Sequence, residues 1–209
     1  MLLYDFALAP NPQRVRVFLK EKGIDLPNQE VKIREGQQHE EPFVTKNPFR
    51  LTPFLELDDG TVIAESMAIC RYLEELHPTP NLFGSDAKER AVVEMWNRRL
   101  EMDGFAHLGL AARNANPMFV GRVIPGLKSD HKQVPEIVTR CREMFGLFLP
   151  KLDTQLATNS YVAGDRFTVA DITGIFTIRA AKAQEIDMSG APNVERWFAE
   201  VSARPAFQS

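Results

Sequence analysis

The chain has 209 residues, of which 44% are hydrophobic and 25% are charged, and its formal net charge is −3. This composition is typical of a globular protein long enough for two small domains, and it argues against extended disorder. Nucleic-acid binding has little support, because phosphate backbones require clustered Lys and Arg and the chain has no long basic run.

Cysteine usage and the N-terminal residues bear on where the protein acts. The two cysteines, Cys70 and Cys141, cannot form a disulfide framework, which favours a reducing compartment. Residues 1–14 lack the basic start and the long apolar core of a secretory signal. No run of about 18 apolar residues is present to span a bilayer. We therefore expect a cytoplasmic protein with neither a membrane nor a nucleic-acid partner.

The first third of the chain alternates strand-like and helix-like patterns. Four segments have the apolar runs or the period-two alternation of strands, namely residues 2–6, 29–34, 54–57 and 61–64. Asp58-Asp59-Gly60 predicts a hairpin between the last two. A helix with an apolar face is expected to open at Pro12 and end at Gly23, and a second helix spans residues 65–77. This order of elements is that of a thioredoxin-like α/β domain.

The rest of the chain has no convincing strand. Four helices are expected, opening at Asp86, Pro135, Thr168 and Pro192. Asp86 with Glu89, and Thr168 with Asp171, have the spacing of N-terminal capping boxes. Pro150 lies inside the helix from Pro135 and should kink or divide it. These patterns predict an all-α second domain.

The domain boundaries follow from a stretch rich in proline and glycine, Pro78 to Gly84, which comes after the helix predicted over residues 65–77. We expect a thioredoxin-like domain over residues 1–80, a linker at 81–87 and an all-helical domain over 88–209.

Two dipeptides, Thr52-Pro53 and Glu65-Ser66, stand on either side of the predicted hairpin. In this setting they resemble the part of cytosolic glutathione transferases, of the bacterial theta- and nu-like type, that holds the tripeptide. The resemblance extends over almost the whole chain. It implies that Pro53 follows a cis peptide bond and that the main chain of Thr52 pairs with the cysteinyl backbone of glutathione.

The same resemblance assigns the two ends of glutathione. Ser66 and the helix N-terminus would bind the γ-glutamyl carboxylate, while Glu65 would face the ammonium group; the alternative is that Glu65 and Ser66 only cap the helix. Gln38, in a segment that resembles the one reaching the glycyl end, would donate to the glycyl carboxylate. The alternative for Gln38 is a solvated loop, and His39 beside it has the same two interpretations.

Several residues near the start of the chain are candidates for activating the sulfur. Such an enzyme stabilises the glutathione thiolate, because the thiolate is the nucleophile. The resemblance places Ala9, which has no donor, at the usual serine position. Tyr4 lies one residue from the tyrosine-type position, and alternation along a strand turns it to the other face. Asn11, just before the helix expected from Pro12, is the best catalytic candidate, with Arg14 a weaker one; the alternative for Asn11 is an N-cap.

The function implied by the resemblance is that of a glutathione transferase. It would use glutathione as co-substrate to attack a small hydrophobic electrophile, with the helical domain lining the electrophile site and a homodimer as the assembly. A Pro-Asn pair before the helix also resembles a bacterial branch that reduces disulfides. A glutathione-dependent disulfide or peroxide reductase, or a non-catalytic glutathione-binding module, therefore remains open. The histidines and cysteines have no metal-ligand spacing, so no metal site is expected.

Overall fold

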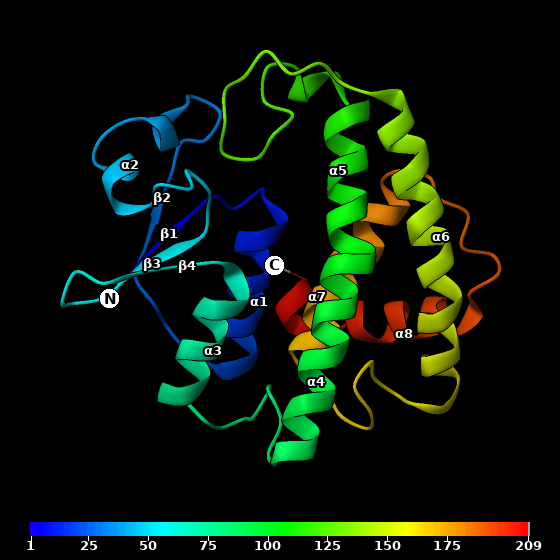
Figure 1. The fold of residues 1–209 in the computed structure, drawn as a ribbon. Coiled ribbons are helices and arrows are strands. Elements are labelled where there is room, and N and C mark those ends of the chain that lie inside the picture. The colour runs from blue at the N-terminus through cyan, green and yellow to red at the C-terminus, as the bar shows by residue number, and fades with distance from the viewer. Residues whose placement is uncertain (209) are drawn as a thin grey trace. The chain divides into compact units, whose positions relative to one another are not determined.

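The computed structural model describes residues 1–208, which form two units (Figure 1). The first unit contains residues 1–80 together with the short segment 125–128, and the second contains residues 81–124 and those from 129 on. Residues 81–87, expected to be a linker, belong to the second unit. The division into domains at 1–80 and 88–209 otherwise stays a prediction.

Four short strands form the sheet of the first unit: β1 (Leu2–Asp5), β2 (Asn28–Glu30), β3 (Phe54–Glu56) and β4 (Val62–Ala64). Their order is β2-β1-β3-β4, in which β1 and β2 are parallel and the other pairs are antiparallel. Parallel neighbours need a crossover connection, and α1 (Pro10–Lys22) provides it. The order of strands and helices is the one expected from the sequence.

The two faces of this sheet are covered by different elements. Leu3 and Leu55 are paired across β1 and β3 and almost fully buried, on the face covered by α1 and α3 (Ser66–Leu76). Tyr4 and Phe54 alternate to the other face, where they pack with Phe43 of α2 (Phe43–Lys46). The Tyr4 and Phe54 rings are stacked with their centroids 4.4 Å apart. Figure 1 shows α1 and α3 together on one side of the strands and α2 on the other.

A buried ion pair joins the C-terminal ends of α1 and α3. Lys22 Nζ lies 2.7 Å from Glu74 Oε2, and it also donates to the carbonyl oxygen of Pro80 at 2.6 Å. Both charged side chains are buried, so each needs the other to compensate for lost hydration. The ion pair therefore holds the C-terminal ends of α1 and α3 together, and the bond to Pro80 attaches the segment after α3 to them.

Some boundaries in the first unit differ from those expected. The strand predicted over 29–34 ends at Glu30, because the chain turns after Val31. The N–H of Val31 still donates to the carbonyl of Asp5, but the carbonyl of Val31 accepts from Ile33 N–H at 2.8 Å. The first helix begins at Pro10 and not at Pro12. Proline is well suited to the first helical turn, where it lacks only an N–H that has no helical partner. Gly23 ends α1 with a left-handed φ of +65°, as predicted.

The second unit is helical, as expected. Its elements are α4 (Ala87–Arg99), a π-helical turn η2 (Leu100–Phe105), α5 (Ala106–Ala115), η3 (Pro117–Phe119), α6 (Pro135–Thr158), α7 (Val169–Lys182), α8 (Pro192–Ser202) and η4 (Pro205–Phe207). Pro150 does not divide α6, which is a single helix. Helix α7 is buried along most of its length and packs against α4, α5 and α8.

The π-helical turn, which the sequence did not predict, lies against α7. A Cβ atom at Gly104 would approach Thr177 Cγ2 to 2.6 Å and Phe148 to 3.6 Å. Glycine therefore allows a close contact between this turn and the buried helix. The turn makes α4 and α5 nearly continuous, and the helix expected from Asp86 extends well beyond Leu100.

A buried carboxylate fixes the start of α7. The Asp171 carboxylate accepts from the Thr168 N–H, and Asp171 donates its own N–H to the Thr168 hydroxyl, which confirms the predicted capping box. It also accepts from Val162 N–H and from Trp197 Nε1, each at 2.9 Å. Complete burial raises the pKa of Asp171 to about 6, and these donors act against the rise. One side chain thus connects α7, α8 and the loop before α7.

The segment before α4 is held by a second polar network. Asp86 accepts from Glu89 N–H at 2.9 Å, as the predicted capping box requires. The Glu89 carboxylate, however, accepts from the N–H and hydroxyl of Ser85 and not from the N–H of Asp86. The second carboxylate oxygen of Glu89 pairs with Arg166, whose guanidinium also donates to Asn81. Hydrogen bonds from Arg166 and Ser85 lower the pKa of Glu89 to about 2.

This network predicts acid-dependent stability. The folded-state pKa of Glu89 lies below its ordinary value of 4.5, so its stabilising effect is complete above pH 4.5 and is lost as the pH falls through about 2. Replacing Glu89 by Gln should therefore lower the free energy of unfolding by roughly 1–3 kcal/mol at pH 7. Urea denaturation at several pH values measures this, and the difference from the parent should shrink towards pH 2.

Glu143 provides the matched control for this prediction. Its ion pair with Arg140 joins two exposed side chains, so Glu143→Gln should leave the free energy of unfolding nearly unchanged. A stability difference between Glu89→Gln and the parent that stayed constant down to pH 2 would contradict the assigned ion pair.

Candidate functional site

The register of the sheet brings together the two dipeptides singled out in the sequence. Phe54 of β3 is paired with Ala64 of β4 in an antiparallel register. The pairing ends there, so Thr52-Pro53 immediately precede β3 and Glu65-Ser66 immediately follow β4. The hairpin therefore gathers the four residues at one end of the sheet, where α3 begins.

The main chain of Thr52 has the geometry expected from the resemblance. The peptide bond between Thr52 and Pro53 is cis. Among residues 1–208, neither the N–H nor the carbonyl of Thr52 forms a hydrogen bond, although the neighbouring Leu51 carbonyl accepts from Asn47. Both main-chain groups are therefore available to pair with an extended ligand backbone.

Glu65 and Ser66 stand at the N-terminus of α3 without capping it by their side chains. Glu65 precedes the helix with φ at +71°, a value that non-glycine residues seldom adopt, and its carboxylate makes no capping bond. Ser66 is only 4% exposed, and its hydroxyl has no partner within the part of the chain that the structure describes. The simple capping interpretation thus has no hydrogen bond to support it, and both side chains remain free to contact a ligand.

Asn11 lies inside the first turn of α1 and is not its N-cap, which is Ala9. The N-cap alternative is therefore wrong. Pro10 and Pro12 have no N–H, and the N–H of Gln13 donates to Ala9, so Asn11 supplies the one unpaired N–H of this turn among the described residues. Its side-chain oxygen accepts from Arg14 at 3.3 Å, which leaves the amide nitrogen as a second donor.

Tyr4 is engaged elsewhere and does not take part in the candidate site. Its hydroxyl donates to Glu56 and accepts from Lys46, each at 2.7 Å. The hydrogen bonds to Glu56 and Tyr4 raise the pKa of Lys46, and those from Lys46 and Tyr4 lower the pKa of Glu56. Since this network lies on the face covered by α2, the structure confirms that alternation turns Tyr4 away from α1.

Basic side chains gather around His39, the residue that follows Gln38 in the chain. Burial lowers the pKa of His39, and the nearby charges of Lys128 and Arg50 lower it further, which shows that the three lie close together. Two buried atoms in this group, Gln38 Oε1 and Arg50 Nε, have no hydrogen-bond partner. A Cβ atom at Gly36 would lie 3.4 Å from Lys128 Nζ. We call these residues, Gln38, His39, Arg50 and Lys128, the basic cluster.

Arg50 and Lys128 were not predicted as site residues. Arg50 lies two positions before Thr52, so its place in the chain was a usable signal. Lys128 belongs to the segment 125–128, which reaches the first unit from a distant part of the chain. Gly126 makes this approach possible, because its φ is +74° and a Cβ atom there would lie 2.2 Å from the carbonyl oxygen of Phe49.

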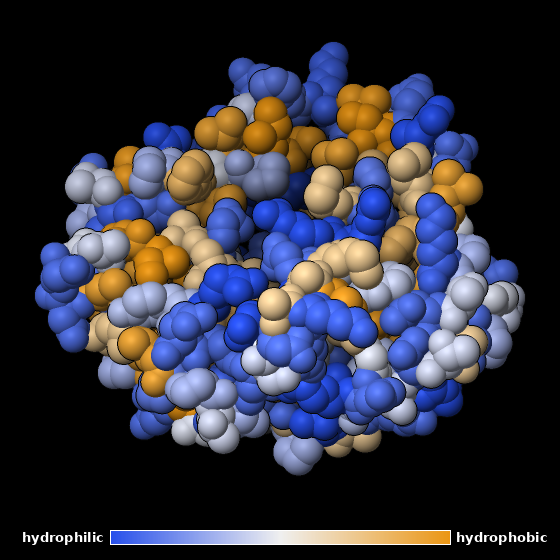
Figure 2. Space-filling model, turned by 60° about the horizontal axis from the view of Figure 1, so that its bottom comes forward, coloured by the Kyte–Doolittle hydropathy of each residue, from blue (hydrophilic) through white to orange (hydrophobic). Residues whose placement is uncertain are grey.

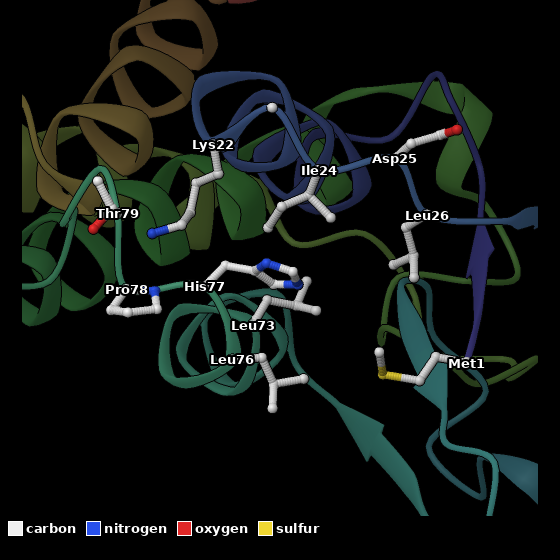
Figure 3. Close-up of a pocket in the computed structure, with 11 residues that line it drawn as sticks. Met1, Lys22, Ile24, Asp25, Leu26, Leu73, Leu76, His77, Pro78 and Thr79 are labelled. Atoms are coloured by element: carbon white, nitrogen blue, oxygen red, sulfur yellow. The ribbon is translucent and has the colours of Figure 1, made fainter.

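The first unit also has a hollow of about 420 Å³, but the predicted site residues do not line it. It lies at the C-terminal ends of α1 and α3, with Lys22 and Ile24 facing Leu73, Leu76 and His77 (Figure 3). The N-termini of the same two helices carry Asn11 and Ser66. The hollow and the candidate site are therefore at opposite ends of these helices.

Residues 1–208 hold neither a metal-ligating cluster nor a membrane-spanning helix. No group of three or more His, Cys, Asp and Glu side chains in this range could hold a metal ion. No helix in the same range is both long enough and apolar enough to cross a membrane.

Two family models match the chain. Residues 9–76 match the N-terminal domain of glutathione S-transferases, and residues 116–205 match the C-terminal domain. The chain is 33% identical over 99% of its length to glutathione S-transferase 2 of Saccharomyces cerevisiae, of which it covers 87%.

Solved structures agree with these matches. A glutathione S-transferase of class Gtt2 from Vibrio parahaemolyticus is 40% identical, with a TM-score of 0.85 and coverage of 100% of this chain and 96% of that one. A glutathione S-transferase domain-containing protein of Marinobacter aquaeolei is 35% identical, with a TM-score of 0.88 and full coverage of both chains. They confirm the expected thioredoxin-like and all-helical fold. The chain belongs to the glutathione S-transferase family and uses glutathione as its co-substrate.

Proposed function

We propose that this transferase holds extended glutathione along the end of the sheet and directs its sulfur to the N-terminus of α1. The observation that carries the proposal is the unpaired main chain of Thr52, which lies at the end of the β3–β4 hairpin where Ser66 begins α3. The cysteinyl N–H and carbonyl would pair there as a short additional strand. The second substrate is a small hydrophobic electrophile that the thiolate attacks.

The γ-glutamyl end fits the start of α3. Its carboxylate is suited to Ser66, whose hydroxyl has no other partner in the described chain, and to the partial positive charge of the helix N-terminus. Its ammonium group is suited to the carboxylate of Glu65, which makes no capping bond. The ammonium group would thus meet a carboxylate at Glu65, and the glutamyl carboxylate would meet hydrogen-bond donors at Ser66.

Replacing Ser66 by Ala tests this part of the site. Loss of one hydrogen bond to a charged group should raise the KM for glutathione by about tenfold, with a smaller change in kcat. Initial rates at varied glutathione, with chlorodinitrobenzene as the electrophile, measure both constants. Ser189→Ala, which truncates an exposed serine, is the matched control. An unchanged KM in Ser66→Ala would remove Ser66 from the site.

The glycyl end fits the basic cluster. Its carboxylate would meet the positive charges of Arg50 and Lys128 and the amide of Gln38, and Arg50 Nε is buried and still lacks a hydrogen-bond partner. Arginine is well suited to a carboxylate because its planar fork can donate two parallel hydrogen bonds. The cluster therefore has both the charge and the donors that this end of glutathione needs.

The glycyl ethyl ester of glutathione tests this assignment, because it removes only the charge that the basic cluster would bind. The parent should have a KM at least about tenfold lower for glutathione than for the ester. In Arg50→Gln this preference should fall towards one, since the principal charge is gone. Equal loss of affinity for both thiols would indicate that Arg50 only supports the loop.

The sulfur would be stabilised by the first turn of α1. Asn11 would supply two donors to the sulfur, its unpaired main-chain N–H and its side-chain amide. The Arg14 guanidinium adds positive charge beside them. The helix N-terminus contributes a further partial positive charge. This arrangement assigns the role that a serine or tyrosine hydroxyl has in other members to Asn11.

Thiolate absorbance of bound glutathione, titrated against pH, tests this role. The parent should show a thiol pKa well below that of free glutathione. Asn11→Ala removes the side-chain donor but keeps the main-chain N–H, so the bound pKa should rise by about one unit, equivalent to 1.36 kcal/mol, without reaching the free value. An unchanged pKa in Asn11→Ala would leave the main chain as the only activator at this position.

We also propose a homodimer that acts in the cytoplasm. Several large apolar side chains are exposed, among them Phe49 at 66% and Met102 at 62%, and association would cover such surface. Figure 2 shows separate apolar patches on a mainly hydrophilic face. Both cysteines are free, which suits a reducing compartment.

A further inference from the structure

Two arginines of the second unit share one aromatic ring. The guanidinium carbon of Arg113 lies 4.8 Å from the centroid of Phe119, and that of Arg122 lies 5.8 Å from the same centroid. Arg113 comes from the last turn of α5, while Phe119 ends η3 and Arg122 follows in the next turn. Side chains from three points of the chain thus bring two full positive charges together.

Main-chain hydrogen bonds fix the two side chains in place. Arg113 Nη1 donates to the carbonyl of Arg122 at 2.8 Å, and Arg122 Nε donates to the carbonyl of Met118 at 2.9 Å. Gln133 supports the base of the arrangement by donating to the carbonyl of Arg113 at 2.9 Å. Each guanidinium carries five N–H donors, so most donors of the pair remain after these bonds are counted.

The pair has no compensating negative charge within residues 1–208. Neither Arg113 nor Arg122 forms an ion pair with a carboxylate there. Burial lowers the pKa of Arg113, and the charge of Arg122 lowers it further. Attraction to an aromatic face offsets only about 0.5–2 kcal/mol for each cation, and partly buried charges are otherwise paired in proteins. The arrangement therefore favours an anion from outside the chain.

Apolar surface adjoins the charges. Met118 is 60% exposed and Val120 is 67% exposed, and both are neighbours of Phe119 in the chain. A ligand that satisfies the whole arrangement has one carboxylate for the guanidinium forks and an apolar, preferably flat, body for the side chains around them.

We infer that Arg113 and Arg122 form a binding site for the carboxylate of an aromatic second substrate. This inference rests on the proposed function, since it names the class of electrophile that the transferase takes. In the reaction, the glutathione sulfur forms a bond to the electrophilic carbon while the leaving group departs with its electron pair, and the thiol proton passes to solvent. The carboxylate does not react; it only fixes the substrate.

A matched pair of electrophiles tests the inference: para-(chloromethyl)benzoate and its methyl ester. Glutathione displaces chloride from either one, and the two differ in the negative charge. The parent should have the higher kcat/KM for the acid. In Arg122→Gln the ratio of acid to ester should fall by at least about tenfold, a change of 1.4 kcal/mol, mainly through the KM for the acid.

Three further measurements separate anion binding from a structural role. Arg122→Lys keeps the charge but loses the planar fork, so its ratio should lie between those of the parent and Arg122→Gln. Arg140→Gln removes an exposed arginine of the same unit and should keep the parental ratio. Calorimetry with unreactive para-methylbenzoate, without glutathione, should show binding to the parent that weakens at least about tenfold in Arg122→Gln.

The outcomes distinguish the two claims. If the parent binds para-methylbenzoate through Arg122 but conjugates neither electrophile, the proposed transfer reaction fails and the anion site stands. If both electrophiles are conjugated, and Arg122→Gln keeps both the parental ratio and the parental binding of para-methylbenzoate, the anion site is overturned. Equal losses for acid and ester in Arg122→Gln also overturn it, since they would show that Arg122 only supports the turn.

Discussion

The antiparallel register of β3 is the constraint on which the candidate site depends. Leu55 is paired with Leu3 of β1 and with Ile63 of β4. Its complete burial fixes which residues of β3 point towards the helices. A shift of the register by one residue would exchange the two faces of the strand and expose this leucine. The packing of one buried leucine thus fixes the register of the hairpin whose end carries both Thr52 and Ser66.

The chemistry of the sulfur depends on a second, independent constraint at the start of α1. Pro10 and Pro12 remove two of the N–H groups that a helix usually offers there, so the remaining donors are concentrated in Asn11. Tyr4 cannot substitute, because Lys46 and Glu56 hold its hydroxyl on the other face of the sheet. The end of the β3–β4 hairpin is therefore assigned to holding glutathione, and the start of α1 to activating its thiol. Substitutions in one element should change one of these two properties without the other.

Features set by neighbouring residues could be predicted from the sequence, whereas those set by distant contacts could not. Gly23 at the end of α1 and the Thr168–Asp171 box were found because each depends on a few adjacent positions. The strand expected over 29–34 ended early because Val31 and Ile33 both pack against the same apolar cluster, so their alternation signals burial and not strand pairing. Lys128 joins the basic cluster only through the tertiary approach of Gly126 to Phe49, for which the sequence has no periodic or spacing signal.

Hydrogen exchange at the Thr52 amide tests the central claim most directly, because that amide is unpaired within the described chain and is assigned to the cysteinyl carbonyl of glutathione. Exchange is followed by NMR in the free protein and with saturating glutathione. The assigned pairing predicts that glutathione slows exchange of this amide markedly, while exchange of the amides around the hollow at Lys22 and His77 is unaffected. Unchanged exchange at Thr52, with glutathione demonstrably bound, would contradict it.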